Sequence, residues 1–430
     1  MTSARRRVLA LAVPALGALA AEPLFVMVDS AIVGHLGTVP LAGLALAGMV
    51  LDTCVYLCVF LAYATTAGVA RACGAGDLPE AARRGVDALW LALGLGVVVG
   101  AALYAGGRAV LRWFGPDPSV FAAASQYLRW SAPGMPAMLV VLAAIGVLRG
   151  LQNTRVTLYV AVTGGVINAA VSLLLCYPAG MGIRGAAVGT VVAQTAMALW
   201  AGGLVVRFAR RSGAELTPHP HGVGEAARVG APLFLRTCCL RAAGLSSLWV
   251  ASSLGAVQLA AHQIVSNVWM FSALSTDALA IAAQALVGAS LGSGDAGELR
   301  AVKKTVVNLS VLSGAGLGAL FAASAWTLPW AFTPDRAVVT AATPALLVVA
   351  LCMPLAAWAF ALDGILMGAE TEGPFLAKGM AMSLACYLPW AAAVAAWATG
   401  AAGLPLLWVG YAGEFMLARS LIYRRRAAAV

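Results

Sequence analysis

The sequence predicts an all-α polytopic membrane protein, with twelve transmembrane helices in two pseudo-symmetric six-helix lobes. The first observation is compositional: 62% of the 430 residues are hydrophobic and only 10% are charged, as is typical of chains with many membrane spans. The second is a series of twelve apolar runs, each long enough to cross a bilayer. The third is an internal parallel repeat, in which short sequences recur at one constant difference in residue number (offset 218), which we call the repeat offset.

The apolar runs fall into two sets of six, separated by one long polar stretch. The first set lies at 8–34, 41–71, 85–107, 120–148, 156–178 and 185–206, and the second at 229–252, 257–290, 304–330, 337–366, 374–397 and 403–423. We therefore expect an N-terminal lobe over 1–206, a cytoplasmic linker over 207–228 and a C-terminal lobe over 229–430. The basic start of the chain precedes an apolar run without a clear cleavage site, which predicts an uncleaved first span.

Basic residues in the loops predict the orientation. With the N-terminus inside, nineteen of the 27 Lys and Arg residues fall in cytoplasmic segments, while the outside loops hold only Arg108, Arg112, Arg184 and Arg336. Cytoplasmic loops of membrane proteins carry an excess of Lys and Arg, so both termini are expected in the cytoplasm. The expected location is the inner (plasma) membrane. The basic residues are scattered between apolar runs, so we expect no nucleic-acid partner.

The repeat is visible as matched landmarks in the two halves. LGTVPLA (36–42) matches LGAVQLA (254–260), GAGDLPE (74–80) matches GSGDAGE (292–298), and FGPDPSV (114–120) matches FTPDRAV (332–338). Pro14 pairs with Pro232 at the same repeat offset. Each half has an even number of spans, so the halves are expected to face the same way, as in the parallel repeats of alternating-access carriers.

Two carboxylates stand inside the first predicted span. Glu22 and Asp29 are seven residues apart, which places them on the same face of a helix, and Pro23 between them weakens the helix locally. A carboxylate in the bilayer costs about 2.5–3.5 kcal/mol on insertion scales, so its presence indicates a function. The repeat places Leu240 and Ser247 at the equivalent positions, so the acids belong to the N-terminal half alone. This asymmetry favours a specific proton or cation site.

Four stretches resemble a known transporter family. PLFVMVDSAIVGHLGTVPLAGLALA (23–47) resembles the first-helix signature of the multidrug and toxic compound extrusion (MATE) family. Three further stretches resemble the DNA-damage-inducible F (DinF) branch of that family. They are RGLQNTRVTLYVAVTGGVINAAVSLLL (149–175), HQIVSNVWMFSALSTDALAIAAQALVGASLGSGD (262–295) and LDGILMGAET (362–371). The resemblance implies two six-helix lobes around a central cleft.

The resemblance also implies an ion-coupling site in the N-terminal lobe. In the DinF branch, an acid on the first helix, an Asn and an Asp one turn apart on the fifth and a Thr on the sixth form a cation site. Asp29, Asn168 and Thr190 match this pattern and form the possible Na⁺ site, whereas Ser172 replaces the Asp of the fifth helix. A hard cation prefers several anionic oxygens, whereas one carboxylate can take and release a proton. The sequence therefore favours proton coupling, although interhelical hydrogen bonding alone is an alternative for these polar residues.

Several other intramembrane charges are candidates. Glu22 is expected to act either as a second proton relay or as the partner of a buried Arg. Asp277 is the candidate for coupling or substrate charge in the C-terminal lobe, and Asp363 for a gate or helix-end residue. Arg241 lies deep in the seventh span, where pairing with an acid such as Asp277 is the simplest expectation, while Arg236 is expected to reach the inner membrane surface.

These observations together predict a secondary active antiporter that exports amphipathic or cationic organic compounds in exchange for protons, or alternatively sodium, by alternating access. The sequence has no nucleotide-binding loop and no metalloprotease or nucleophile motif, so we expect an ion gradient as the driving force, no cofactor and no enzymatic activity. A small organic substrate and the lipid bilayer are the expected partners, and the protein is expected to act as a monomer. Two alternatives stay open: a lipid-linked precursor flippase, kept by Arg236 and Arg241, and more remotely an intramembrane enzyme.

Overall fold

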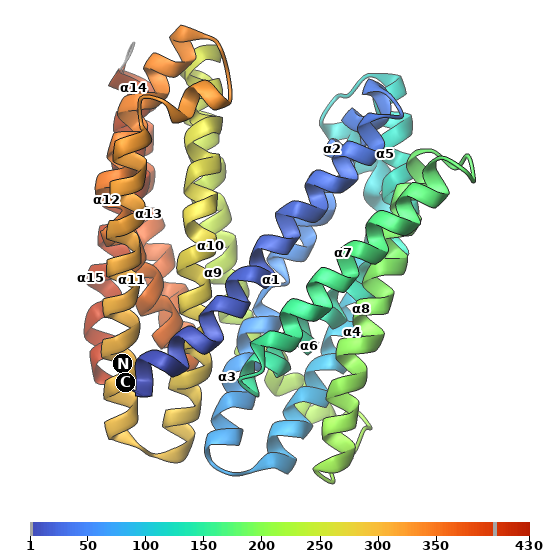
Figure 1. Cartoon of the computed structure of the whole chain (residues 1–430), viewed down its shortest axis with the longest axis vertical. Helices are drawn as coiled ribbons and strands as arrows, with labels where there is room; N and C mark the ends of the chain where they lie inside the picture. Colours follow the sequence, from blue (N-terminus) through green and yellow to red (C-terminus); the bar gives the residue numbers. More distant parts are fainter. Residues whose placement is uncertain (1–2, 399–401) are drawn as a thin grey trace. The chain divides into compact units, whose positions relative to one another are not determined.

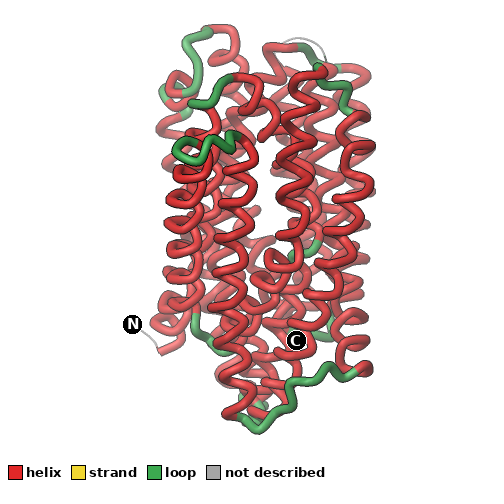
Figure 2. Tube along the Cα trace, turned by 90° about the vertical axis from the view of Figure 1, so that its right-hand side faces the viewer, coloured by secondary structure: helices red, strands yellow, loops and turns green. Residues whose placement is uncertain are grey.

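A computed structural model describes residues 3–398 and 402–430, and within these ranges the chain is helical with short connections and no strand (Figure 2). The N-terminal half contains α1 (Ser3–Gly34), α2 (Thr38–Leu57), α3 (Phe60–Gly74), α4 (Leu78–Trp113), α5 (Pro118–Ser131), η1 (Ala132–Gly134), α6 (Met135–Gly150), α7 (Thr154–Cys176) and α8 (Ile183–Arg211). The C-terminal half contains α9 (Pro220–Ser253), α10 (Ala256–Ser293), α11 (Ala296–Ser324), η2 (Leu328–Ala331), α12 (Arg336–Gly368), α13 (Gly373–Trp397), α14 (Gly403–Trp408), η4 (Val409–Glu414) and α15 (Phe415–Ala429) (Figure 1).

The predicted class, an all-α polytopic membrane protein, is confirmed. Among the described residues, eleven helical segments are long and apolar enough to cross a membrane. Two of them are made of consecutive helices: α2 with α3 forms one crossing, and α5 with α6 forms another. The last predicted span, 403–423, consists of α14, the π-helical turn η4 and the first part of α15.

The landmarks of the repeat are helix starts. Gly76 and Gly294 have φ of 79° and 71°, in the left-handed region that favours glycine. The next residues, Asp77 and Asp295, are N-caps of α4 and α11, and each accepts a hydrogen bond from the backbone N–H three residues later, at 2.9 and 2.8 Å. Such a cap contributes about 1 kcal/mol to a helix. The repeated letters therefore encode one repeated turn.

The repeat also fixes two close helix contacts. Gly100 of α4 faces the backbone of Ala132, and Gly318 of α11 faces the backbone of Ala350, so that a Cβ at either glycine would overlap a carbonyl oxygen. The repeat offset relates Gly100 to Gly318 and Ala132 to Ala350. Small residues allow membrane helices to approach closely, and this approach strengthens van der Waals packing where lipid supplies no hydrophobic driving force.

The chain forms two compact units. One contains α1 up to Ala12, together with Leu235–Leu291 and Asp295–Val430, and the other contains Val13–Phe234 and Gly292–Gly294. The divisions fall inside α1 and α9, beside Pro14 and Pro232 respectively. The boundaries expected from the sequence, at residues 206 and 229, stay predictions.

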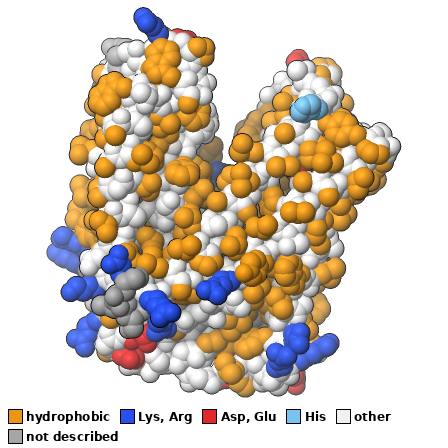
Figure 3. All heavy atoms as spheres, in the orientation of Figure 1, with side chains coloured by type: hydrophobic (Ala, Val, Ile, Leu, Met, Phe, Trp, Pro, Cys, Tyr) orange, Lys and Arg blue, Asp and Glu red, His pale blue; other side chains and the backbone are white. Residues whose placement is uncertain are grey.

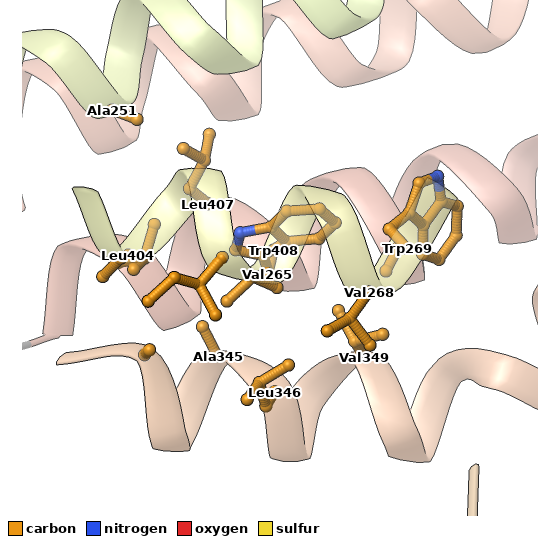
Figure 4. Packing of buried hydrophobic residues seen from close by; sticks show 14 of the residues in the cluster. Ala251, Val265, Val268, Trp269, Ala345, Leu346, Val349, Leu404, Leu407 and Trp408 are labelled. Atoms are coloured by element: carbon orange, nitrogen blue, oxygen red, sulfur yellow. The ribbon is translucent and has the colours of Figure 1, made fainter. Parts of the chain in front are cut away.

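Each unit has its own apolar interior. In the unit that holds the C-terminal half, Trp269 and Trp408 lie among aliphatic side chains such as Val268 and Leu407 (Figure 4). The outer surface is also apolar: Leu199, Leu351 and Trp397 are 73%, 84% and 81% exposed. On the face drawn in Figure 3, hydrophobic side chains are spread over the whole visible surface. This surface matches a lipid environment.

The start of α1 and the end of α15 lie at the same end of their unit (Figure 1). Arg7 of α1 forms an ion pair with Glu298 in the first turn of α11. Lys303, in the next turns of α11, donates to the carbonyl oxygen of Ala428 in α15 at 3.4 Å. An even number of crossings between the ends of the chain agrees with this arrangement, while the side of the membrane that they face stays a prediction.

Candidate functional site

The carboxylate of Asp29 projects from α1 towards α7 and α8. Asn168 of α7 donates from Nδ2 to Oδ1 of Asp29 at 2.7 Å, and Thr190 of α8 donates from Oγ1 to Oδ2 at 3.4 Å. Each carboxylate oxygen therefore has its own donor, and each donor comes from a different helix. The structure brings together the three residues that the sequence predicted as the centre of the ion-coupling site.

Ser172 completes this group at one remove. Its hydroxyl donates to Oδ1 of Asn168 at 3.5 Å, so it contacts the amide rather than Asp29. Because the amide oxygen accepts from Ser172, the amide nitrogen is left to face Asp29. Gly189 of α8 lies against the Ser172 side chain, where a Cβ would overlap the hydroxyl, so this glycine permits the close approach of α7 and α8.

Two residues of α5 belong to the site although the sequence pattern did not single them out. Tyr127 is 4% exposed, its hydroxyl lies beside Thr190 and Ser131, and it is within electrostatic range of Asp29. Ser131 is fully buried. The available signal was a pair of polar residues one helical turn apart in an apolar span, the same pattern that identifies Asn168 with Ser172.

Glu22 does not join the Asp29 group. It is exposed on α1, two turns or roughly 10 Å along the helix from Asp29. The charges that act on it are those of Asp52 on α2 and Arg149 on α6. Arg149 is 9% exposed, so Glu22 lies within range of a buried guanidinium, one of the two surroundings that the sequence suggested for it.

The C-terminal half holds a different charged group, which we call the Asp363 cluster: Asp363 of α12, Arg236 of α9 and Arg419 of α15. Both guanidiniums donate to Oδ2 of Asp363. All three side chains are buried, with exposures of 1%, 6% and 0%. Arg419 also lies over the ring of Phe360, 5.1 Å from its centroid. The three charges sum to +1, so this carboxylate is neutralised by basic side chains.

The cluster changes the expectation for Arg236. Arg236 was expected to reach the inner membrane surface, but the structure buries it against Asp363, because the short path to an intraprotein carboxylate satisfies its charge without extension to water. Asp363 was expected to be a gate or helix-end residue, and its role stays a prediction. Asp277 on α10 and Arg241 on α9 are partly buried, and their pairing likewise stays a prediction.

Comparison with known families gives a match to both halves. A sequence model of the family described as MatE matches residues 14–174 and again residues 232–397. The two matches begin at Pro14 and Pro232, which are equivalent positions of the internal repeat.

Comparison with individual proteins agrees with the family match. The chain is 32% identical over 381 residues to Protein DETOXIFICATION 44, chloroplastic, of Arabidopsis thaliana, covering 85% of this chain and 72% of that protein. It is 26% identical over 409 residues to DNA damage-inducible protein F of Escherichia coli (strain K12), covering 92% and 89%.

Solved structures share the fold. A mutant of the Vibrio cholerae MATE transporter VcmN superposes with a TM-score of 0.90 at 19% identity, covering 100% of this chain and 98% of that one. A MOP superfamily transporter from Pyrococcus furiosus superposes with a TM-score of 0.88 at 21% identity, covering 99% and 96%.

Proposed function

Because the chain belongs to the MatE family of membrane transporters, we propose that it is a secondary active antiporter that exports amphipathic or cationic organic compounds in exchange for protons. The observation that carries the proposal is the environment of Asp29: one carboxylate in a membrane-spanning helix, with one neutral donor on each oxygen. A carboxylate with neutral partners changes the charge of its site by a full unit when it binds a proton. That change is what an ion-coupled transporter needs.

The hydrogen bonds of Thr190 suit both protonation states of Asp29. The Thr190 hydroxyl has one proton and two acceptors, Oδ2 of Asp29 at 3.4 Å and the carbonyl oxygen of Ala186 at 3.1 Å. When Asp29 is ionised, the hydroxyl can donate to the carboxylate. When Asp29 is protonated, the acid can donate to Oγ1 of Thr190 while the hydroxyl turns to Ala186. Proton binding therefore requires only the rotation of one hydroxyl.

The same contacts favour a proton over sodium. A hard cation requires several oxygen ligands, yet Asn168 presents its amide nitrogen to Asp29 and its amide oxygen to Ser172. The amide would have to turn over, and lose both hydrogen bonds, before its oxygen could share a cation with Asp29. Ser172 also contributes no charge.

The antiport cycle follows from the charge of Asp29. An ionised Asp29 holds α7 and α8 to α1 through charge-assisted hydrogen bonds, and protonation weakens those bonds. We propose that this changes the bend of α1 near Pro23, and that the change favours the state that releases substrate. Export across the inner membrane by a monomer with both termini in the cytoplasm completes the proposal.

A second candidate function, flipping of a lipid-linked precursor, has one observation in its favour. The Asp363 cluster carries a net charge of +1 inside the C-terminal half, and an anionic headgroup would complement it. Its guanidiniums are already bound to Asp363, so the antiporter remains the proposal that the contacts support best.

The test is transport of a fluorescent organic cation in proteoliposomes, with a pH gradient or a sodium gradient imposed separately. Wild type is compared with Asp29→Asn and with Asp117→Asn, a matched change at an exposed helix start where the side chain makes no cap hydrogen bond. We expect dye movement driven by the pH gradient in wild type and Asp117→Asn, and none in Asp29→Asn. Transport driven only by sodium would refute proton coupling, and normal transport by Asp29→Asn would remove Asp29 from the mechanism.

A further inference from the structure

The last predicted span, 403–423, contains a carboxylate that the mechanism above does not use. Glu414 lies eleven residues from the start of α14 at Gly403, or about 16 Å along the helix, near the middle of a bilayer core of about 30 Å. Its Oε2 is buried and, within the described part of the chain, has no hydrogen-bond partner. An acid at this depth is costly to place in a membrane and is by default a functional residue.

The backbone at Glu414 is unusual. Residues Val409–Glu414 form the π-helical turn η4 between the α-helices α14 and α15. Such single turns are rare and frequently occur at functional sites, because the extra residue changes the direction in which side chains project. Two residues that bracket Glu414, Tyr411 and Phe415, stack with an interplanar angle of 15° and centroids 5.9 Å apart. The turn is thus held in a packed aromatic environment.

Hydroxyl groups from two other helices gather near this acid. The ring of Tyr387 of α13 packs against the rings of Tyr411 and Phe415, with centroids 5.8 and 5.9 Å apart, and therefore lies close to Glu414. Its hydroxyl lies beside those of Ser246 and Ser247 on α9. Tyr387 is fully buried and Ser247 is 3% exposed, yet Tyr387 Oη and Ser247 Oγ make no geometrically complete hydrogen bond to described residues. Buried polar groups are nearly always satisfied in native proteins, so the unpaired atoms of Glu414, Tyr387 and Ser247 leave hydrogen-bonding capacity here that a bound ligand or ion would use.

The internal repeat relates this group to the Asp29 site of the N-terminal half. The repeat offset relates Ser247 to Asp29, so Ser247 occupies the place of the proton-binding acid in the C-terminal half. There the hydroxyl faces a tyrosine, and the nearby acid is Glu414 in the last span rather than a residue of α9. In each half, a carboxylate inside a span therefore lies near the hydroxyl group of a tyrosine from another helix: Tyr127 near Asp29, and Tyr387 near Glu414.

The other titratable groups around Glu414 are neutral or occupied. Cys352 of α12 faces Gly413, with Sγ 3.6 Å from the position that a Cβ there would take. His262 of α10 packs on Trp408, with ring centroids 5.4 Å apart. Among the described basic side chains, Arg419 lies five residues further along α15, and it is bound to Asp363. Within the described part of the chain, none of these neighbours forms an ion pair with Glu414.

We propose that Glu414, with Tyr387 and Ser247, forms a second proton-binding site in the C-terminal half, so that each transport cycle carries two protons. The inference rests on the proposed antiport function and specifies its stoichiometry. A proton bonds to one oxygen of the Glu414 carboxylate and makes it neutral, and it leaves to water when the cycle returns; the Tyr387 hydroxyl keeps its own proton throughout. A proton suits this site because it needs one oxygen, whereas a hard cation needs several.

The test measures the number of protons per substrate in proteoliposomes that contain the full chain. With the membrane potential clamped at zero, a pH difference of one unit is opposed by a substrate gradient until net flux stops. Each coupled proton contributes about 1.4 kcal/mol per pH unit, so two protons balance a gradient of about 100-fold and one proton a gradient of about tenfold. We expect about 100-fold for wild type and Glu414→Asp, and about tenfold for Glu414→Gln.

The outcomes separate the two proposals. A wild-type balance near tenfold, or an unchanged balance in Glu414→Gln, overturns the second site and leaves Asp29 as the coupling residue. No pH-driven transport in wild type overturns the antiport function itself.

If Glu414→Gln is inactive, infrared difference spectra of the purified protein give the second readout, taken between alkaline pH and a mildly acidic pH at which exposed carboxylates are still ionised. Loss of a protonated-carboxyl band in Glu414→Gln, but not in the Gln variant of a distant exposed acid, Glu225, supports the site. The same spectrum in wild type and Glu414→Gln overturns it.

Discussion

Replacement of Asp363 by asparagine should destabilise the C-terminal half strongly, because two buried guanidiniums share this one carboxylate. Asparagine preserves the shape but removes the charge, so the buried charge of the cluster rises from +1 to +2. Removal of one partner from a buried ion pair costs about 3–5 kcal/mol. For a folded unit of about 200 residues this corresponds to a fall in Tm of about 6–20 °C.

Arg236→Met should destabilise the C-terminal half much less than Asp363→Asn. It leaves Asp363 paired with Arg419, lowers the net buried charge to zero and keeps an apolar chain of similar length, so we expect a cost of about 1 kcal/mol or less. The sharpest comparison is the double variant: addition of Arg236→Met to Asp363→Asn should recover part of the lost stability, because the buried charge falls from +2 to +1.

Thermal unfolding of the purified protein in detergent, followed as loss of the monodisperse fraction, measures these changes, with Asp117→Asn as the control. If the double variant is less stable than Asp363→Asn alone, then packing of the Arg236 side chain, rather than charge balance, holds the cluster together. That result would refute the reasoning.

Three further predictions concern the N-terminal site and the repeated turns. Ser172→Asp adds a second carboxylate beside Asn168, so dye transport should become stimulated by sodium. Gly189→Ala places a methyl group against the Ser172 hydroxyl and so pushes α7 away from α8. It should lower the stability measured by thermal unfolding by about 1–3 kcal/mol, and pH-driven transport should fall by a larger factor than the expression level. Asp77→Ala and Asp295→Ala should each lose about 1 kcal/mol, since both remove an equivalent cap; a large difference between them would argue against equivalent turns.

The sequence revealed the features that depend on local chemistry. The helix starts at Asp77 and Asp295 follow from a side chain that bonds its own backbone, and the left-handed Gly76 and Gly294 follow from steric limits on other residues. Apolar runs longer than a bilayer account for the spans. The fold could therefore be predicted almost completely.

Some site residues were predicted and others were missed, because side-chain contacts depend on which sides of the helices pack together. Asp29 was recognisable as an acid in an apolar span, while Asn168 and Thr190 were assigned through the family resemblance. Tyr127 could not be placed without knowing which side of α5 packs against α8. Arg419 meets Asp363 only because α12 and α15 are neighbours, an arrangement that no local pattern encodes.

Glu414 was not among the site residues predicted from the sequence, although it could have been. The rule that singled out Asp29, a carboxylate well inside a predicted span, applies equally to Glu414 in 403–423. The repeat drew attention to Ser247 as the counterpart of Asp29 and therefore suggested that the C-terminal half lacked an acid there. That comparison follows equivalent backbone positions, whereas a chemical group can be supplied to one place by any helix that reaches it.

The repeat thus keeps the same backbone geometry in the two halves while their charges differ. Equivalent glycines and caps set equivalent turns and helix contacts, as at Gly100 and Gly318. The carboxylates follow no such equivalence: among the described residues, the donors to Asp29 are the neutral Asn168 and Thr190, whereas Asp363 is held by two permanent positive charges. When a carboxylate with neutral partners binds a proton, no neighbouring side chain loses an ionic partner. Protonation of Asp363, by contrast, would leave two buried guanidiniums without a counter-charge. Coupling by protons should therefore use Asp29 and Glu414, with the Asp363 cluster as a fixed structural link among α9, α12 and α15.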